Sequence, residues 1–142
     1  MITTKEKIVF KSKFGNIQII SVEEKITSLN FTKYKSISSN SNVLNKAKKQ
    51  IEDYILGKRK KFCIGINLIG TEFQLNVWNQ LILIPYGETF SYLKIAKILN
   101  TSPRAIGNAC GKNPILFIIP CHRVISVNGS LSGFSALGGI KT

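Results

Sequence analysis

The chain has 142 residues, 44% of them hydrophobic, which is enough for one domain or two small ones with a packed core and excludes a disordered chain. No apolar run approaches the roughly 20 residues that span a bilayer, and the N-terminus lacks the apolar core of a signal peptide, so we expect a cytoplasmic protein that binds no membrane. The net charge of +13 favours a polyanionic partner such as nucleic acid, although a proteome of generally basic proteins would show the same excess.

The first third of the chain has the pattern of a small sheet. Residues 8–10 are apolar and residues 17–20 are apolar except for Gln18; the two runs flank Gly15-Asn16, a turn signal, so they predict a hairpin. Residues 25–31 predict a third strand. Residues 43–56 carry apolar side chains at helical spacing.

Glycine and lysine mark the end of that first domain. Gly57 is a predicted helix stop, and the basic residues 58–61 have the composition of a linker. We therefore expect an N-terminal α/β domain over residues 1–60 and a connecting segment over residues 61–69.

The second domain is predicted over residues 70–142 and is mainly helical. Thr71 and Gln74 form a capping-box pattern ahead of the first helix. Two shorter helices follow across the tight turn Asn100-Thr101, which predicts a helix-turn-helix. Their N-caps are Ser91 and Ser102, with Pro103 at the first position of the second helix.

An apolar run, residues 115–119, leads into Pro120-Cys121-His122 and is predicted to be a buried strand. The predicted fold class is therefore α+β: a small N-terminal sheet-plus-helix domain, then a mainly helical domain with a helix-turn-helix and a short active-site strand.

Cys121 stands beside His122, the chain's only histidine. A thiol with an imidazole next to it is a recipe for nucleophilic sulfur, although buried structural cysteines are common. Cys63 and Cys110 are predicted to be buried structural thiols. Because the three cysteines lie far apart and one histidine cannot build a cluster, no metal site is predicted.

The second helix of the helix-turn-helix is rich in small residues, among them Ala105 and Gly107, with Arg104 in its first turn. Small side chains allow close packing against the core, or close approach to a DNA backbone. The helix has few long polar side chains for reading bases, so it suits shape-based binding in the minor groove. Taken alone, Arg104 has the pattern of a solvated surface residue.

From Gly70 to Lys141, half of the chain, a series of motifs resembles the O6-alkylguanine-DNA alkyltransferases, also called methylated-DNA–protein-cysteine methyltransferases. The motifs follow in order: residues 70–74, Val77-Trp78, residues 84–87, Ser91-Tyr92, residues 104–107, Asn113-Pro114 and residues 120–125. The first 60 residues are similar to the family only in broad pattern.

The resemblance implies direct DNA repair by a monomer that needs no cofactor. Its expected partner is double-stranded DNA that contains O6-alkylguanine, with O4-alkylthymine as a second candidate substrate. The damaged base is flipped out of the duplex, and a cysteine thiolate takes the alkyl group and keeps it, so each molecule acts once.

The resemblance also assigns roles to residues of this chain. Cys121 is the alkyl acceptor, and His122 is the base, which acts through a bound water. Asn113 is the hinge residue that supports the active-site strand. Tyr92 rotates the nucleotide phosphate and hydrogen-bonds the flipped base. Arg104 is the finger that fills the vacated stack, on the DNA-binding helix that holds Ala105 and Gly107.

The base pocket is assigned in the same way. Val124, through its carbonyl, and Ser135, through its N–H, would hold the guanine edge and O6. Phe134 stands where many members of the family have tyrosine, so the aromatic wall is kept and a hydroxyl is lost.

One departure concerns the end of the chain. In the family, a glutamate on a final helix orients the histidine, whereas here no carboxylate follows Glu88. Either the sequence is truncated, or the protein lacks that helix and its glutamate. We expect DNA binding to persist, with alkyl transfer slowed, because base and orienting group act together, or with the fold weakened.

Two other functions stay open. A damage-sensing or regulatory DNA-binding module would need no acceptor cysteine, and the presence of Cys121 favours the enzyme over it. A thiol hydrolase would need an oxyanion hole, for which the sequence gives no indication.

Overall fold

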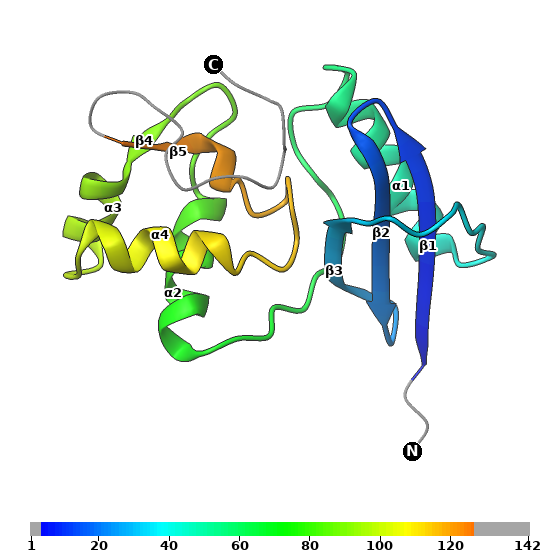
Figure 1. Cartoon of the computed structure of the whole chain (residues 1–142), viewed down its shortest axis with the longest axis horizontal. Helices are drawn as coiled ribbons and strands as arrows, with labels where there is room; N and C mark the ends of the chain where they lie inside the picture. The colour runs from blue at the N-terminus through cyan, green and yellow to red at the C-terminus, as the bar shows by residue number, and fades with distance from the viewer. Residues whose placement is uncertain (1–3, 127–142) are drawn as a thin grey trace. The chain divides into compact units, whose positions relative to one another are not determined.

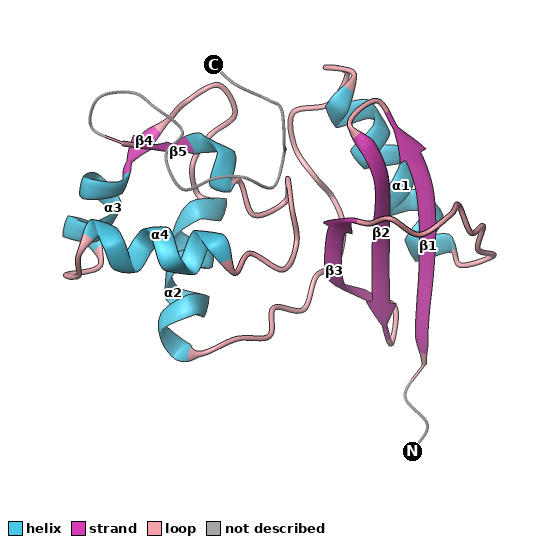
Figure 2. Cartoon of the chain, in the orientation of Figure 1, coloured by secondary structure: helices cyan, strands magenta, loops and turns pink. Residues whose placement is uncertain are grey.

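The structure, a computed structural model, describes residues 4–126 and falls into two compact units, Met1–Ile69 and Gly70–Thr142. The first unit combines an antiparallel sheet with one helix, and the second is mainly helical (Figures 1 and 2). The predicted α+β class is confirmed. No helix in the described part of the chain is long and apolar enough to cross a bilayer.

The sheet of the first unit is an antiparallel meander in the order β1-β2-β3, formed by Lys5–Ser12, Gly15–Val22 and Lys25–Phe31. The predicted hairpin is confirmed, with Ser12 opposite Gly15, whose φ of +128° suits glycine. Because side chains alternate along a strand, Ile8, Phe10, Ile17 and Ile19 share one face.

Helix α1, Asn42–Ile55, covers that face of the sheet with Leu44, Ala47 and Ile51, all fully buried (Figure 1). Ser41 caps its N-terminus by accepting from the Leu44 N–H at 3.2 Å. After the helix, Gly57 has a φ of +77°, as expected for a glycine stop.

In the second unit, α2, Glu72–Ile82, begins with the predicted capping box, in which the Thr71 and Gln74 side chains each accept from the other residue's N–H. Helices α3, Tyr92–Ile98, and α4, Pro103–Gly111, form the predicted helix-turn-helix, capped by Ser91 and Ser102. Between them Asn100 has a φ of +55°, the left-handed conformation that asparagine tolerates in a tight turn.

The prediction of a buried strand over residues 115–119 is wrong. The segment is buried but forms tight turns, with a φ of +67° at Phe117. The short strand comes later: β5, Val124–Ile125, pairs in parallel with β4, Phe90–Ser91. Cys121 lies between the turns and β5, in the single 3₁₀ turn η1, Cys121–Arg123.

The prediction that Cys63 is buried is also wrong, because its side chain is exposed. The buried Gln50 side chain anchors the backbone here: it accepts from the Cys63 N–H at 2.9 Å and donates to the Cys63 carbonyl at 3.3 Å. With the backbone held this way, Ile64, Ile66 and Leu68 are the better-covered positions of the alternating segment.

The start of α2 predicts the effect of one glycine substitution. A Cβ at Gly70 would lie 2.6 Å from the Trp78 ring and 2.9 Å from the Gln74 oxygen that completes the capping box. We expect Gly70→Ala to lower the free energy of unfolding by about 1–3 kcal/mol, measured by urea titration with the fluorescence of Trp78, the chain's only tryptophan.

Gly111→Ala is the matched control, because a Cβ there meets nothing within 4 Å and the residue ends a helix. It should leave stability unchanged or raise it by up to about 1 kcal/mol. Equal losses in the two variants would contradict the packing described for Gly70.

Candidate active site

Asn113 organises the segment that carries the cysteine. Its Oδ1 accepts from the Ile115 N–H at 2.9 Å, and its Nδ2 donates to the Ile119 carbonyl at 2.9 Å. One side chain thus satisfies backbone groups at both ends of a buried turn that would otherwise need a sheet partner. This is the physical reason that residues 115–119 do not form a strand.

The same Asn113 amide reaches the cysteine. Its Nδ2 lies 3.3 Å from the Cys121 Sγ, which in turn lies 3.7 Å from the backbone carbonyl of Cys110 in α4. Only 1% of Cys121 is exposed. The sulfur is therefore buried against the C-terminal end of α4 with an amide donor directed at it.

The surroundings of Cys121 favour the neutral thiol in the free protein. The neighbouring Cys110 side chain, and then burial, raise the pKa of Cys121 well above its usual range, while the Asn113 hydrogen bond acts in the opposite direction. Cys110, buried as predicted, thus affects the cysteine through both its carbonyl and its side chain. The contact with the carbonyl could not be predicted from the sequence, because every residue has a backbone carbonyl.

Tyr92, the first residue of α3, belongs to the same cluster. It is 7% exposed, and a Cβ at Gly107 would lie 3.9 Å from its ring, an ordinary contact distance, so α4 passes close to the ring. Burial, and then the nearby Cys110 and Cys121, raise the pKa of Tyr92 to about 12. Its phenol is therefore a neutral donor at pH 7.

His122 is half-buried, with its ring edge-on to Phe117 at 6.4 Å between centroids. Burial, and then the adjacent Arg123 charge, lower the pKa of His122 to about 4. The imidazole is therefore neutral at pH 7 and able to accept a proton.

Arg123 fixes the 3₁₀ turn to the end of α2, a contact that the sequence analysis missed. Its guanidinium donates to the Ile84 carbonyl at 2.7 Å and lies 5.6 Å from the centre of the Tyr86 ring. Trp78 in α2 donates to the Ala109 carbonyl at 2.9 Å. Helices α2 and α4 and the cysteine turn are thereby held together by side-chain hydrogen bonds.

The other predicted site residues divide into three groups. Arg104 is exposed in the first turn of α4, with Ala105 and Gly107 partly exposed beside it. Val124 is fully buried at the start of β5, opposite Phe90. Phe134 and Ser135 lie outside the described residues. So does the end of the chain, where the family's final helix and its glutamate were expected to be missing.

Between residues 4 and 126, no group of three or more His, Cys, Asp or Glu side chains is arranged to hold a metal ion. The described geometry is that of a helix-turn-helix with a buried cysteine held beside its second helix.

Comparison with known proteins identifies the class more closely. Residues 72–142 match the family described as "6-O-methylguanine DNA methyltransferase, DNA binding domain", and residues 6–68 match its "ribonuclease-like domain". The chain is 41% identical over 142 residues to the methylated-DNA–protein-cysteine methyltransferase of Methanosarcina acetivorans, covering 94% of this chain and 91% of that protein. It is 50% identical over 95 residues to the inducible methylated-DNA–protein-cysteine methyltransferase of Bacillus subtilis, covering 66% of this chain and 53% of that protein.

Solved structures agree with these relatives. The crystal structure of Mycobacterium tuberculosis O6-methylguanine methyltransferase superposes with a TM-score of 0.82 at 31% identity, covering 94% of this chain and 87% of that one. The Mycobacterium tuberculosis protein OGT in complex with DNA gives a TM-score of 0.80 at 34% identity, covering 90% and 83%. The chain belongs to the methylated-DNA–protein-cysteine methyltransferases, a family of DNA repair enzymes.

The Asn113 amide predicts a measurable change in thiol reactivity. Asn113→Asp would replace a donor with an oxygen that repels both the Ile119 carbonyl and a Cys121 thiolate. We expect Cys121 to react with iodoacetamide at least tenfold more slowly at pH 8, in line with about 1.5–3 kcal/mol for a hydrogen bond to a charged group. The reaction is followed by peptide mass mapping.

Asn108→Asp adds the same charge at an exposed position of α4 and is the matched control. Equal slowing in the two variants would show that added charge, rather than the lost donor, is responsible.

The raised pKa of Cys121 predicts a pH dependence. A thiol below its pKa gains thiolate tenfold per pH unit, so the alkylation rate of Cys121 should rise steadily from pH 6 to pH 9. No step should appear between pH 5 and pH 8, because His122 stays neutral there. The measurement uses Cys63→Ser, which removes the exposed thiol. A plateau near pH 7, or a step near pH 6.5, would contradict the described environment.

Proposed function

We propose that this protein repairs O6-alkylguanine in duplex DNA by transferring the alkyl group irreversibly to Cys121. The observation that carries the proposal is the Cys121 sulfur, buried beside α4 with the Asn113 amide 3.3 Å away, in a chain of this family. It is supported by the printed names of the relatives, which specify methylated DNA and a protein cysteine.

Burial of the sulfur argues for base flipping. With 1% of Cys121 exposed, a base stacked inside a duplex does not reach it, so the damaged nucleotide has to leave the stack and enter the protein. Arg104, exposed at the start of α4, is the proposed finger that occupies the vacated position. Ala105 and Gly107 are small enough to let α4 approach the DNA backbone.

In the proposed reaction, the Cys121 sulfur attacks the alkyl carbon. A sulfur–carbon bond forms and the carbon–O6 bond breaks. The thiol proton passes to neutral His122 through a water, and His122 returns it by the same route to the guanine as the carbon–O6 bond breaks, so that the thiol proton ends on the guanine. The products are guanine and S-alkylcysteine, and since a thioether does not release its alkyl group, each molecule reacts once.

The remaining residues have proposed roles around this step. Asn113 stabilises the thiolate as it forms, because its amide already points at the sulfur. Tyr92, a neutral phenol against Cys110 and Cys121, donates a hydrogen bond to the base or its phosphate. Val124 presents a carbonyl at the start of β5, and Ser135 and Phe134 complete the pocket.

The acceptor role of Cys121 is tested by Cys121→Ser. This variant should bind a duplex with one O6-methylguanine within threefold of the parent, because the hydroxyl keeps the shape of the buried side chain. Nucleoside analysis of the duplex should show no loss of O6-methylguanine. Loss at the parental rate would contradict the role of Cys121, and binding without transfer by the parent itself would favour a damage sensor.

The finger role is tested by Arg104→Ala. Because Arg104 is exposed and separate from the buried sulfur, the variant should transfer the methyl group from duplex DNA at least tenfold more slowly. Its rate with free O6-methylguanine base should stay within twofold of the parental rate. Equal slowing with both substrates would contradict the finger role, because a free base does not have to be flipped out of a duplex.

A further inference from the structure

The positive charge of this chain is concentrated away from the helix-turn-helix. Residues 1–69 contain fourteen Lys and Arg against five Asp and Glu, whereas residues 70–142 contain six against two. The match to the family's DNA-binding domain begins at residue 72. The larger excess therefore lies in the unit that this match does not cover.

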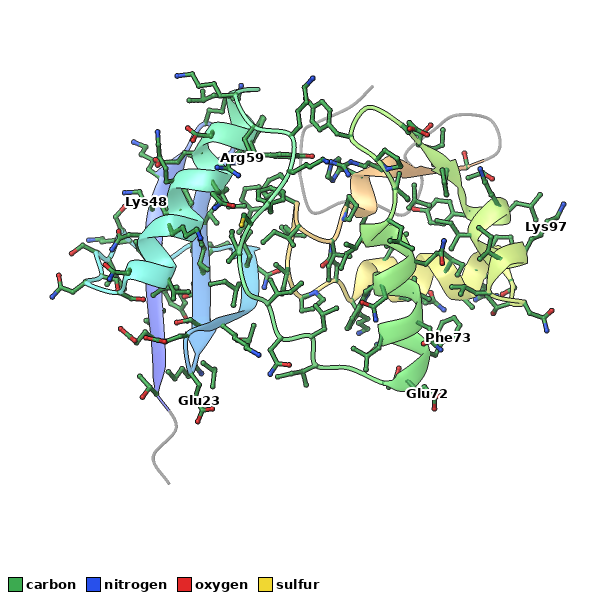
Figure 3. All side chains as sticks on the ribbon, turned by 180° about the vertical axis from the view of Figure 1, so that it is seen from behind. Glu23, Lys48, Arg59, Glu72, Phe73 and Lys97 are labelled. Carbon is green, nitrogen blue, oxygen red and sulfur yellow. The ribbon has the colours of Figure 1, made fainter. Side chains whose placement is uncertain are left out.

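Within the first unit, three of the five acidic residues lie on the side of the sheet that α1 covers. Glu6 shares the strand face of Ile8 and Phe10, and Glu52 and Asp53 belong to α1. Glu23 and Glu24 form the turn at one end of the sheet, where Figure 3 labels Glu23.

Several basic residues on the α1 side already have partners in the protein. Lys49 pairs with Asp53 at 3.1 Å, and Lys48 lies 5.8 Å from the centre of the Phe10 ring. Arg59 donates to the Lys61 carbonyl at 3.0 Å. Figure 3 shows Lys48 and Arg59 on this side. On the α1 side, a carboxylate thus neutralises Lys49, while Lys48 and Arg59 are held by a ring and by a backbone carbonyl.

The opposite face of the sheet, which α1 does not cover, carries exposed lysines. The segment that follows β3 crosses it, held by the Asn16 side chain, which donates to the Tyr34 carbonyl at 2.8 Å, and by the bridge between Val9 and Ile37 (Figure 1). Lys33 and Lys35 are exposed on this segment, and Lys5 and Lys7 are exposed on β1. We call these four lysines and Tyr34 the basic face.

The strand positions that share this face carry no carboxylate within the described register. Lys7 lies opposite Ile20 and then Ser28, and Val9 lies opposite Gln18 and then Asn30. Tyr34 is 62% exposed, with the Lys7 ammonium 5.5 Å from the centre of its ring. Long cationic side chains around an exposed aromatic ring suit a phosphodiester backbone.

We propose that the basic face of the N-terminal unit is a second, sequence-independent contact for the phosphate backbone of DNA. It adds to binding by the helix-turn-helix and needs neither a damaged base nor the Cys121 thiol. The inference requires only that DNA is a partner, so it can fail or hold independently of alkyl transfer.

The salt dependence of DNA binding tests the proposal. The full chain is compared with the triple variant Lys7→Gln, Lys33→Gln, Lys35→Gln on an undamaged duplex. The slope of log K against log [salt] is negative, and each lost phosphate contact lowers its magnitude by about 0.9. The magnitude of the slope, called the slope below, should therefore fall by two to three. Affinity at 0.1 M salt should fall at least tenfold.

Lys46→Gln, Lys58→Gln, Lys61→Gln is the matched control, since it removes the same charge from exposed positions on α1 and after it. Its slope should fall by less than one. Equal falls in the two triple variants would overturn the proposal in favour of diffuse attraction, and an unchanged slope in the first would overturn it outright. Thermal unfolding and transfer from free O6-methylguanine, both expected to stay at parental values, show that the variants are folded.

Discussion

The candidate site depends on the Asn113 side chain, which supplies backbone hydrogen bonds that a neighbouring strand would otherwise provide. Asn113 hydrogen-bonds the backbone at Ile115 and Ile119 and also directs its amide at the Cys121 sulfur. A buried apolar run would ordinarily satisfy its backbone by pairing with neighbouring strands. Here the asparagine supplies those bonds, so the chain turns back within the core and presents the cysteine beside α4.

The electrostatics of the site follow from this burial. The proximity of Cys110, together with burial, raises the pKa of the Cys121 thiol, and burial with the Arg123 charge lowers the pKa of His122 to about 4. In the free protein both groups are therefore neutral at pH 7. An imidazole with so low a pKa is a weak base, so the Asn113 amide is the group placed to stabilise the sulfur as the thiol proton leaves. The environment of Cys121 therefore keeps its thiol protonated in the free protein.

Sequence patterns predicted the elements whose ends are set by local hydrogen bonds. The capping box at Thr71, the caps at Ser91 and Ser102 and the glycine stop at Gly57 depend only on near neighbours, and all lie where they were predicted. The wrong predictions concern segments whose conformation depends on hydrogen bonds from a distant or unpredicted side chain. Gln50 holds the backbone of Cys63, thirteen residues away, and Asn113 decides the path of residues 115–119. For the site, the residues and the family resemblance together indicated Cys121, His122, Asn113 and Tyr92. In the structure the Asn113 amide lies 3.3 Å from the Cys121 sulfur, and Cys110 and Cys121 raise the pKa of Tyr92. The hydrogen bond from Arg123 to the Ile84 carbonyl was not predicted, because the two residues are far apart in the sequence and only the fold brings them together.

The central claim is that the thiol held by Asn113 is the acceptor of one alkyl group. The most direct test is peptide mass mapping of the whole chain after incubation with an excess of duplex that carries O6-methylguanine. We expect one methyl group per protein molecule, on the peptide that contains Cys121, with Cys63 and Cys110 unmodified and no further guanine repaired. A methyl group on another cysteine, or repair of several guanines by each molecule, would contradict it.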